Sequence, residues 1–118
     1  MKQCKMLFKD NTRFLMPCLL LILSEEESHG YGLLERIEAS EYYDHNPDIS
    51  VIYRNLGKLE QHELVEFRWE TQEHGPAKKV YSITEAGKEA LRERVEFMKK
   101  RRDSIDKFIK SYDKRREQ

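Results

Sequence analysis

The sequence predicts a mainly α-helical fold that carries one β-hairpin and ends in a long helix. Three observations support this fold class. Apolar residues recur at helical spacing through most of the chain, residues 65–83 alternate with a period of two, and few helix breakers interrupt residues 85–114. At 118 residues, the chain is long enough for one domain with a modest core.

Charge is balanced over the whole chain but unevenly distributed along it. The 22 Lys and Arg residues match the 22 Asp and Glu residues. Residues 1–16 hold four basic residues against one acidic, residues 24–41 hold one against six, and residues 92–118 hold eleven against six. Without bulk positive charge, the chain can bind nucleic acid only through local patches.

The cysteines and the apolar runs indicate a cytoplasmic protein. Cys4 and Cys18 lack CxxC spacing, so neither a disulfide framework nor a zinc site is expected. The longest apolar run, residues 14–23, contains Pro17 and is too short to cross a bilayer. No signal-peptide cleavage region precedes the polar residues 24–27. We therefore expect no membrane segment and no cofactor, and the sequence leaves a redox role for Cys4 open.

The first structured element predicted is a buried helix. Residues 1–13 form a basic arm without a clear period. Pro17 suits a first helical turn, so a core helix is expected from about Met16 to Leu23. This segment is apolar almost all round, which indicates a central position in the core.

Two further helices are predicted after it. Residues 29–37 open the second helix, with Ser28 as a plausible N-cap. A loop of about ten residues follows, after which Asp48 or Ser50 can cap a third helix.

The third helix, within residues 48–64, has two unlike faces. Ile52, Leu56 and Leu59 share an apolar stripe that suits packing on a core. The stripe assigned to the opposite, outward face consists of Val51, Arg54, Asn55, Lys58 and His62. Arg, Asn and Lys side chains can reach phosphates and base edges in a major groove. A solvated helix face is the alternative interpretation.

A β-hairpin and a long helix complete the predicted fold. Val65, Phe67 and Trp69 alternate with charged residues, a Gly-Pro turn follows, and residues 79–83 alternate again. Thr84 then caps a helix from Glu85 to about Lys114, roughly 45 Å long. Its apolar residues form a heptad seam: Leu91, Val95, Met98, Ile105, Ile109 and Tyr112.

One seam without a second helix to match it favours a homodimer, although the helix could fold back on its own domain. Arg102 falls at the skipped seam position, where it either specifies register or pairs with Asp103 or Asp106.

Three helices followed by a hairpin form the winged helix-turn-helix arrangement, in which the third helix reads the major groove. We expect a basic N-terminal arm at residues 1–13, a DNA-binding domain at residues 14–84 and a dimerisation helix at residues 85–118.

Three motifs resemble the PadR-type repressor family. They are Ser-His-Gly-Tyr-Gly at residues 28–32, the segment 51–60 with its Tyr-Arg pair, and Tyr-Ser-Ile-Thr-Glu-Ala-Gly at residues 81–87. The resemblance extends over residues 14–91, and the single C-terminal helix is similar to the smaller subclass of that family.

The resemblance implies a dimeric transcriptional regulator, usually a repressor, that a small aromatic or amphipathic molecule releases from its operator. It implies Tyr53 and Arg54 at the DNA surface and Lys78 and Lys79 on the wing. Many family members have Pro-Gly-Thr or Pro-Ser-Thr where this chain has Ile49-Ser50-Val51, so a hydroxyl is replaced by a valine that can touch a thymine methyl.

The complete set of residues predicted to bind DNA is Ser50, Val51, Tyr53, Arg54, Asn55, Lys58, Lys78 and Lys79. Phe14, Trp69, Phe97 and Met98 are candidates for the effector site that the resemblance implies.

Other functional classes find less support in the sequence. His29 is isolated from the other potential ligands, so a turn or capping role is favoured over a metal site. No nucleophile–base or carboxylate-pair pattern indicates an enzyme. A winged-helix module that binds another protein remains an alternative, because the chain is neutral and residues 24–41 are acidic.

Overall fold

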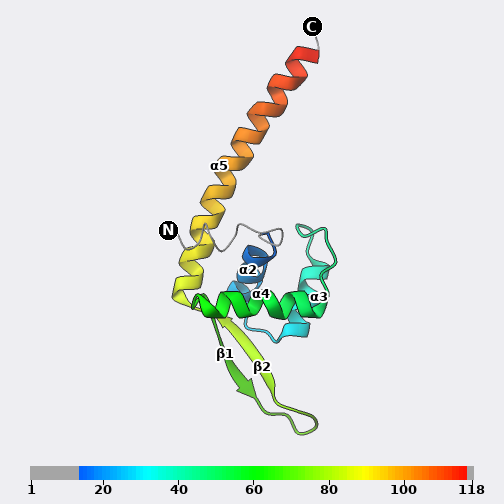
Figure 1. Cartoon of the computed structure of the whole chain (residues 1–118), viewed down its shortest axis with the longest axis vertical. Helices are drawn as coiled ribbons and strands as arrows, with labels where there is room; N and C mark the ends of the chain where they lie inside the picture. The colour runs from blue at the N-terminus through cyan, green and yellow to red at the C-terminus, as the bar shows by residue number, and fades with distance from the viewer. Residues whose placement is uncertain (1–13, 117–118) are drawn as a thin grey trace.

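The computed structural model describes residues 14–116, and the predicted arm at residues 1–13 lies outside this range. The described elements are α2 (Leu15–Glu25), α3 (Gly30–Ala39), α4 (Ile49–Gln61), β1 (Val65–Glu70), β2 (Lys78–Ile83) and α5 (Glu85–Arg116) (Figure 1). Their types and order confirm the prediction of a winged helix-turn-helix followed by a long helix.

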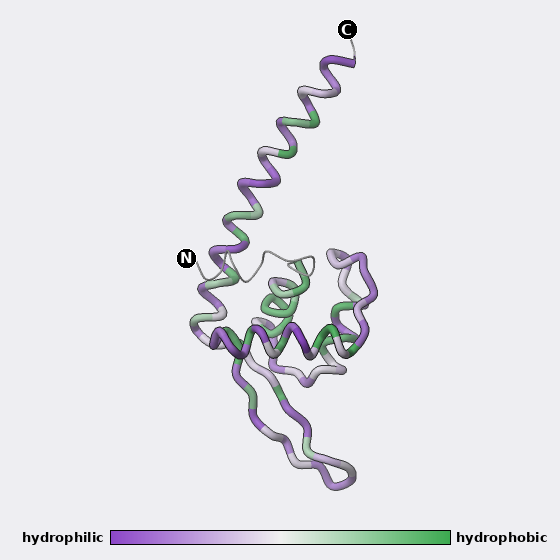
Figure 2. Tube along the Cα trace, in the orientation of Figure 1, coloured by the Kyte–Doolittle hydropathy of each residue, from purple (hydrophilic) through white to green (hydrophobic). Residues whose placement is uncertain are grey.

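Helix α2 forms the centre of the core, as its uninterrupted apolar sequence predicts. It contacts α3, α4, α5 and β2, and Leu15, Leu19 and Leu20 are fully buried. Figure 2 shows the same concentration of hydrophobic residues in α2. Burial also raises the pKa of the Cys18 thiol to about 12, so this cysteine stays a neutral core residue at physiological pH.

The predicted N-cap of α3 was wrong by one residue. His29, not Ser28, caps the helix, and its Nδ1 accepts a hydrogen bond of 2.9 Å from the Gly32 N–H. Ser28 is instead extended: its N–H donates to the Tyr81 carbonyl at 3.0 Å, and the Tyr81 N–H donates to the Ser28 carbonyl at 2.8 Å. Backbone pairing with the hairpin therefore fixes where α3 begins, and the capping interpretation of His29 is confirmed.

Strands β1 and β2 form the predicted hairpin. They pair antiparallel from Val65 opposite Ile83 to Glu70 opposite Lys78. Directly opposed residues share a face, so one face of the hairpin carries all of its apolar and aromatic side chains except the buried Val80. On the other face, Arg68 pairs with Glu27 and with Glu70, which connects the hairpin to the turn between α2 and α3.

The junction between the hairpin and α5 is held by Thr84. Its hydroxyl accepts from the Gly87 N–H at 3.0 Å and donates to the Glu63 carbonyl at 2.7 Å. The predicted cap is thus confirmed, and the same side chain also connects α5 to the end of α4.

Helix α5 leaves the domain after its first turns. Gly87 and Ala90 are buried, and Leu91 packs against the core, whereas every residue from 99 to 116 is exposed. The projecting helix gives the molecule a long axis of 69 Å (Figure 1). Folding of the whole helix back onto its own domain is excluded, and Arg102 pairs with Asp103 at the helix surface.

Glu63, just beyond α4, has a left-handed backbone with φ of 59°. This conformation is costly for a residue with a Cβ, so Glu63→Gly is expected to stabilise the protein by about 1 kcal/mol. Chemical denaturation of the full chain measures the change. The matched Gln61→Gly variant, at the last helical residue of α4, is expected to lower the stability, and a loss of stability in both variants would contradict the backbone argument.

Candidate nucleic-acid interface

Helix α4 begins at a well-formed cap. The Asp48 carboxylate accepts from the Val51 N–H at 3.0 Å and from the Ser50 hydroxyl at 2.6 Å. The Ser50 hydrogen bond, followed by the Val51 N–H, lowers the pKa of Asp48. The cap keeps the first turn of α4 ordered at the surface, and it uses the hydroxyl of Ser50, one of the residues predicted to contact DNA.

The outward face of α4 is a narrow stripe. Ile52, Leu56 and Leu59 are completely buried against the core, as predicted. The residues that point away from them recur at offsets of four, three and four: Ser50, Arg54, Gly57 and Gln61. Tyr53 lies beside this stripe. We call this set, with Tyr53, the α4 face.

Three residues of the predicted outward stripe lie elsewhere. Asn55 is 1% exposed, and its amide donates to the Val51 carbonyl at 2.8 Å, so the prediction of Asn55 at the DNA surface was wrong. Val51 packs partly against the core, and Lys58 is half-buried on the flank of the helix. At 100° per residue, the predicted stripe is centred near Val51 and Lys58, on the flank of the helix and not opposite the buried stripe.

Tyr53 has room for its ring because Gly30, on the neighbouring helix α3, has no side chain. A Cβ added to Gly30 would lie 2.5 Å from the Tyr53 ring, so the ring occupies the space above the first turn of α3. Tyr53 is nevertheless 42% exposed. The glycine of the His-Gly-Tyr motif therefore lets Tyr53 lie flat between α3 and α4 and still present one side to solvent.

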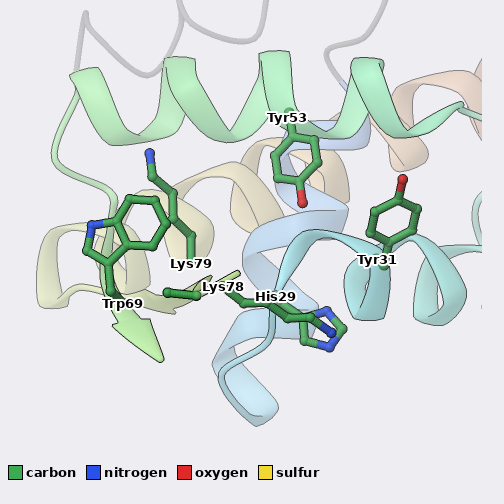
Figure 3. Close-up of a pocket in the computed structure, with 7 residues that line it drawn as sticks. His29, Tyr31, Tyr53, Trp69, Lys78 and Lys79 are labelled. Carbon is green, nitrogen blue, oxygen red and sulfur yellow. The ribbon is translucent and has the colours of Figure 1, made fainter. Parts of the chain in front are cut away.

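A cleft separates the α4 face from the hairpin (Figure 3). Its volume is about 310 Å³, and it is lined by His29, Tyr31, Tyr53, Trp69, Ala77, Lys78 and Lys79. Figure 3 shows that α3, α4 and β1 each contribute one aromatic ring around this space. We call it the wing cleft. Four of its residues were absent from the predicted DNA-binding set: His29, Tyr31, Trp69 and Ala77.

The two lysines of the wing cleft differ in their surroundings. The Lys79 ammonium lies 4.1 Å from the centre of the Phe67 ring and 5.6 Å from that of Trp69, which are contacts of the cation–π type. Lys78 is exposed and faces Glu70 in the strand register. Stacking therefore orders the Lys79 side chain within the cleft, while Lys78 extends from the hairpin edge.

The chemistry of this surface suits a polyanion with flat groups. Ammonium groups and tyrosine hydroxyls are the donors that proteins use on phosphate oxygens, and exposed aromatic rings offer stacking surfaces. The wing cleft also lies beside a helix whose outward stripe is polar. Such a surface, with a helix and a hairpin on either side of a groove, matches the way a winged helix is placed on duplex DNA.

The residues predicted to bind an effector do not lie together within one chain. Phe14 stacks on Tyr43 with 6.3 Å between ring centres, Phe97 lies under Arg94 on α5, and Trp69 lines the wing cleft. Within one chain, the candidate effector residues thus do not form one pocket. Over residues 14–116, no three potential metal-ligating side chains lie together, and no helix is long and apolar enough to span a membrane.

Most seam residues of α5 beyond its first turns are exposed, and Met98 is half-buried. Val95 is 37% exposed, and the exposure rises to 49–54% at Ile105, Ile109 and Tyr112. Phe108, which the predicted seam omitted, is 75% exposed. The described part of the chain leaves this apolar side of α5 uncovered.

Known proteins share this sequence and fold. The chain is 37% identical over 86 residues to the transcriptional regulator YqjI of Escherichia coli (strain K12), a match that covers 70% of this chain and 40% of the relative. The chain therefore spans about 40% of the length of the curated relatives it matches.

Two solved structures extend the comparison. A PadR-like transcriptional regulator from Bacillus cereus is 26% identical with a TM-score of 0.68, over 80% of this chain and 90% of that one. Bacillus subtilis PadR, solved in complex with operator DNA, is 27% identical with a TM-score of 0.64, over 70% of this chain and 46% of that one.

The family comparison agrees with these matches. Residues 19–93 match the model of the transcriptional regulator PadR-like family, which covers α2 to the first turns of α5. This confirms the family that the His-Gly-Tyr and Tyr-Arg motifs predicted, which is a family of transcriptional regulators. The chain belongs to the PadR-like family of transcriptional regulators.

Proposed function

We propose that this protein is a dimeric, cytoplasmic repressor that binds a pseudo-palindromic DNA operator and is released by a small molecule. The observation that carries the proposal is the α4 face, an exposed polar stripe beside a lysine-bearing aromatic cleft. Bacillus subtilis PadR, which is 27% identical, has been solved in complex with operator DNA, and this supports DNA binding by the present chain. Residues 14–84 would act as the DNA-binding unit and residues 85–118 as the dimerisation unit.

In the proposed complex, α4 enters the major groove and the hairpin follows the adjacent backbone. Arg54 is the long cationic side chain of the α4 face and would reach base edges or phosphates. Lys58 on the helix flank and the two lysines of the wing cleft would contact phosphates. Two copies of α4 would enter major grooves about 34 Å apart.

Salt dependence of duplex binding tests this proposal. Duplexes are selected from a random-sequence library with the full chain, and their affinity is measured by gel shift at several salt concentrations. The four basic residues named above occur twice in a dimer, which makes eight. If four of these eight contact phosphates, a plot of the logarithm of the binding constant against the logarithm of the salt concentration should have a slope of about −3.6. Absence of duplex binding at low salt would contradict the proposal and favour a protein-binding winged helix instead.

Dimerisation through α5 makes a separate prediction. Met98→Asp would bury an unpaired charge in the apolar seam, a change that costs several kcal/mol, so the variant is expected to be a monomer by light scattering. Lys100→Asp changes an exposed residue near the seam and should leave the dimer intact. A dimer that survives the Met98 substitution would contradict the proposed seam.

Release by an effector belongs to the same proposal. Phe97 and Met98 lie on the part of α5 where a partner chain would pack, and a second copy could bring Phe14 or Trp69 close to them. These four side chains would then line a site for a small aromatic or amphipathic molecule. Loss of duplex binding on addition of such a molecule, in a gel shift, would support this part.

A further inference from the structure

Gly57 lies in the middle of α4 without a packing reason. A Cβ added there would meet no atom within 4 Å, whereas a Cβ at Gly30, Gly32 or Gly87 would overlap a neighbouring residue, and Gly75 has a φ of 93°. Glycine in a helix interior is less stable than alanine. The chain therefore gives up helix stability at the one glycine where its own fold would accept a side chain.

The missing side chain of Gly57 leaves a gap on the outward side of α4. On the α4 face, Gly57 lies about one turn after Arg54 and one turn before Gln61, so its missing side chain leaves a gap between two longer ones. Arg54 lies beside it, and Lys58 lies on the flank of the helix. The outward side of α4 thus has a shallow centre between longer side chains.

This shallow centre would affect how deeply α4 can enter a major groove. A helix with its side chains is about 10–12 Å across, and the groove is about 12 Å wide. Side chains at the centre of the inserted face therefore limit how far the helix can enter. A bare backbone at that point allows a base-pair edge to approach the helix closely.

We propose that Gly57 is a specificity-determining residue, which lets α4 enter the major groove deeply enough for Arg54 to read base edges. The inference rests on the proposed function, because it requires that α4 face duplex DNA. A side chain at this position would hold the helix away from the bases and would leave phosphate contacts at the groove rim in place.

A Gly57 series in the full chain tests the inference. Gly57→Ala is expected to raise Tm by a few degrees, because alanine favours the helix. Its affinity for the duplex selected by the wild-type chain should fall about tenfold, as for loss of one base contact, and Gly57→Leu should weaken binding further. The affinity of both variants for a random duplex at low salt should stay within about twofold of the wild-type value, because the phosphate contacts remain. The slope of the salt dependence should stay the same for the same reason.

Ser104→Ala is the matched control. It also introduces alanine at an exposed helix position, but on α5 and outside the α4 face, so its affinity for the selected duplex should stay within about twofold of the wild-type value. Wild-type affinity for the selected duplex in both Gly57 variants would overturn the inference. Failure of the wild-type chain to select any duplex would instead overturn the proposed function on which the inference rests.

Discussion

Replacing Gly87 by alanine is expected to lower the free energy of unfolding by about 3 kcal/mol, the largest single effect on stability that we predict. The new Cβ would overlap the Leu64 carbonyl oxygen and lie 2.7 Å from Cγ1 of Ile83. The carbonyl cannot move freely, because it accepts a hydrogen bond from the Thr84 N–H. Relief would require α5 to shift away from the end of α4.

Thermal and chemical denaturation of Gly87→Ala measure this effect. A loss of that size corresponds to a Tm decrease of roughly 10 °C or more. Lys88→Ala, one residue later and exposed, should change the stability by less than about 0.5 kcal/mol. A Gly87→Ala variant as stable as the wild-type chain would show that the junction tolerates the overlap.

The largest expected effect on binding is that of Arg54→Ala. Arg54 is exposed on the α4 face and is the only arginine of α4. Loss of an arginine that reads a base or a phosphate costs about 1–3 kcal/mol, so affinity for the selected duplex should fall about tenfold to a hundredfold. Because Arg54 is not buried, the Tm should hardly change.

Gel-shift titration of the full chain measures this loss. Arg115→Ala removes an arginine near the far end of α5, away from the α4 face, and serves as the control. It should leave the affinity for the selected duplex nearly unchanged. Equal affinities for Arg54→Ala and the wild-type chain would contradict the assignment of α4 as the recognition helix.

The element order could be predicted because each element has a local signal. The uninterrupted apolar run predicts α2, the change to a period of two predicts the hairpin, and Thr84 before a breaker-free segment predicts α5. Capping by Asp48 and Thr84 also depends on neighbouring residues only. These features follow from local chain chemistry, so they are visible in the sequence.

One error arose because a choice between adjacent residues depended on a distant contact, and the other because the outward face of α4 was assigned to the wrong helix positions. Ser28 and His29 can both cap a helix, and pairing of Ser28 with Tyr81 in the hairpin decides between them. For α4, the positions opposite Ile52, Leu56 and Leu59 lead to Ser50, Arg54 and Gly57. The predicted stripe instead included Asn55, which is buried and whose amide donates to the Val51 carbonyl.

The wing cleft could not be predicted as a unit. Its residues come from four separate segments of the chain, and Tyr53 reaches its place only because Gly30 has no side chain. The His-Gly-Tyr motif marks one side of the cleft in the sequence, but nothing local shows that Trp69 lies across from it. Long-range packing of the hairpin against α3 and α4 assembles the site.

The most direct measurement of the central claim is the fluorescence of the protein during a duplex titration. Trp69 is the only tryptophan of the chain and lines the wing cleft, so its emission reports on this surface without any label. If the α4 face and the wing cleft receive DNA, the selected duplex should change the Trp69 emission saturably, with the Kd found by gel shift, and added salt should reverse the change. Duplex binding in the gel shift with an unchanged Trp69 emission would contradict the account.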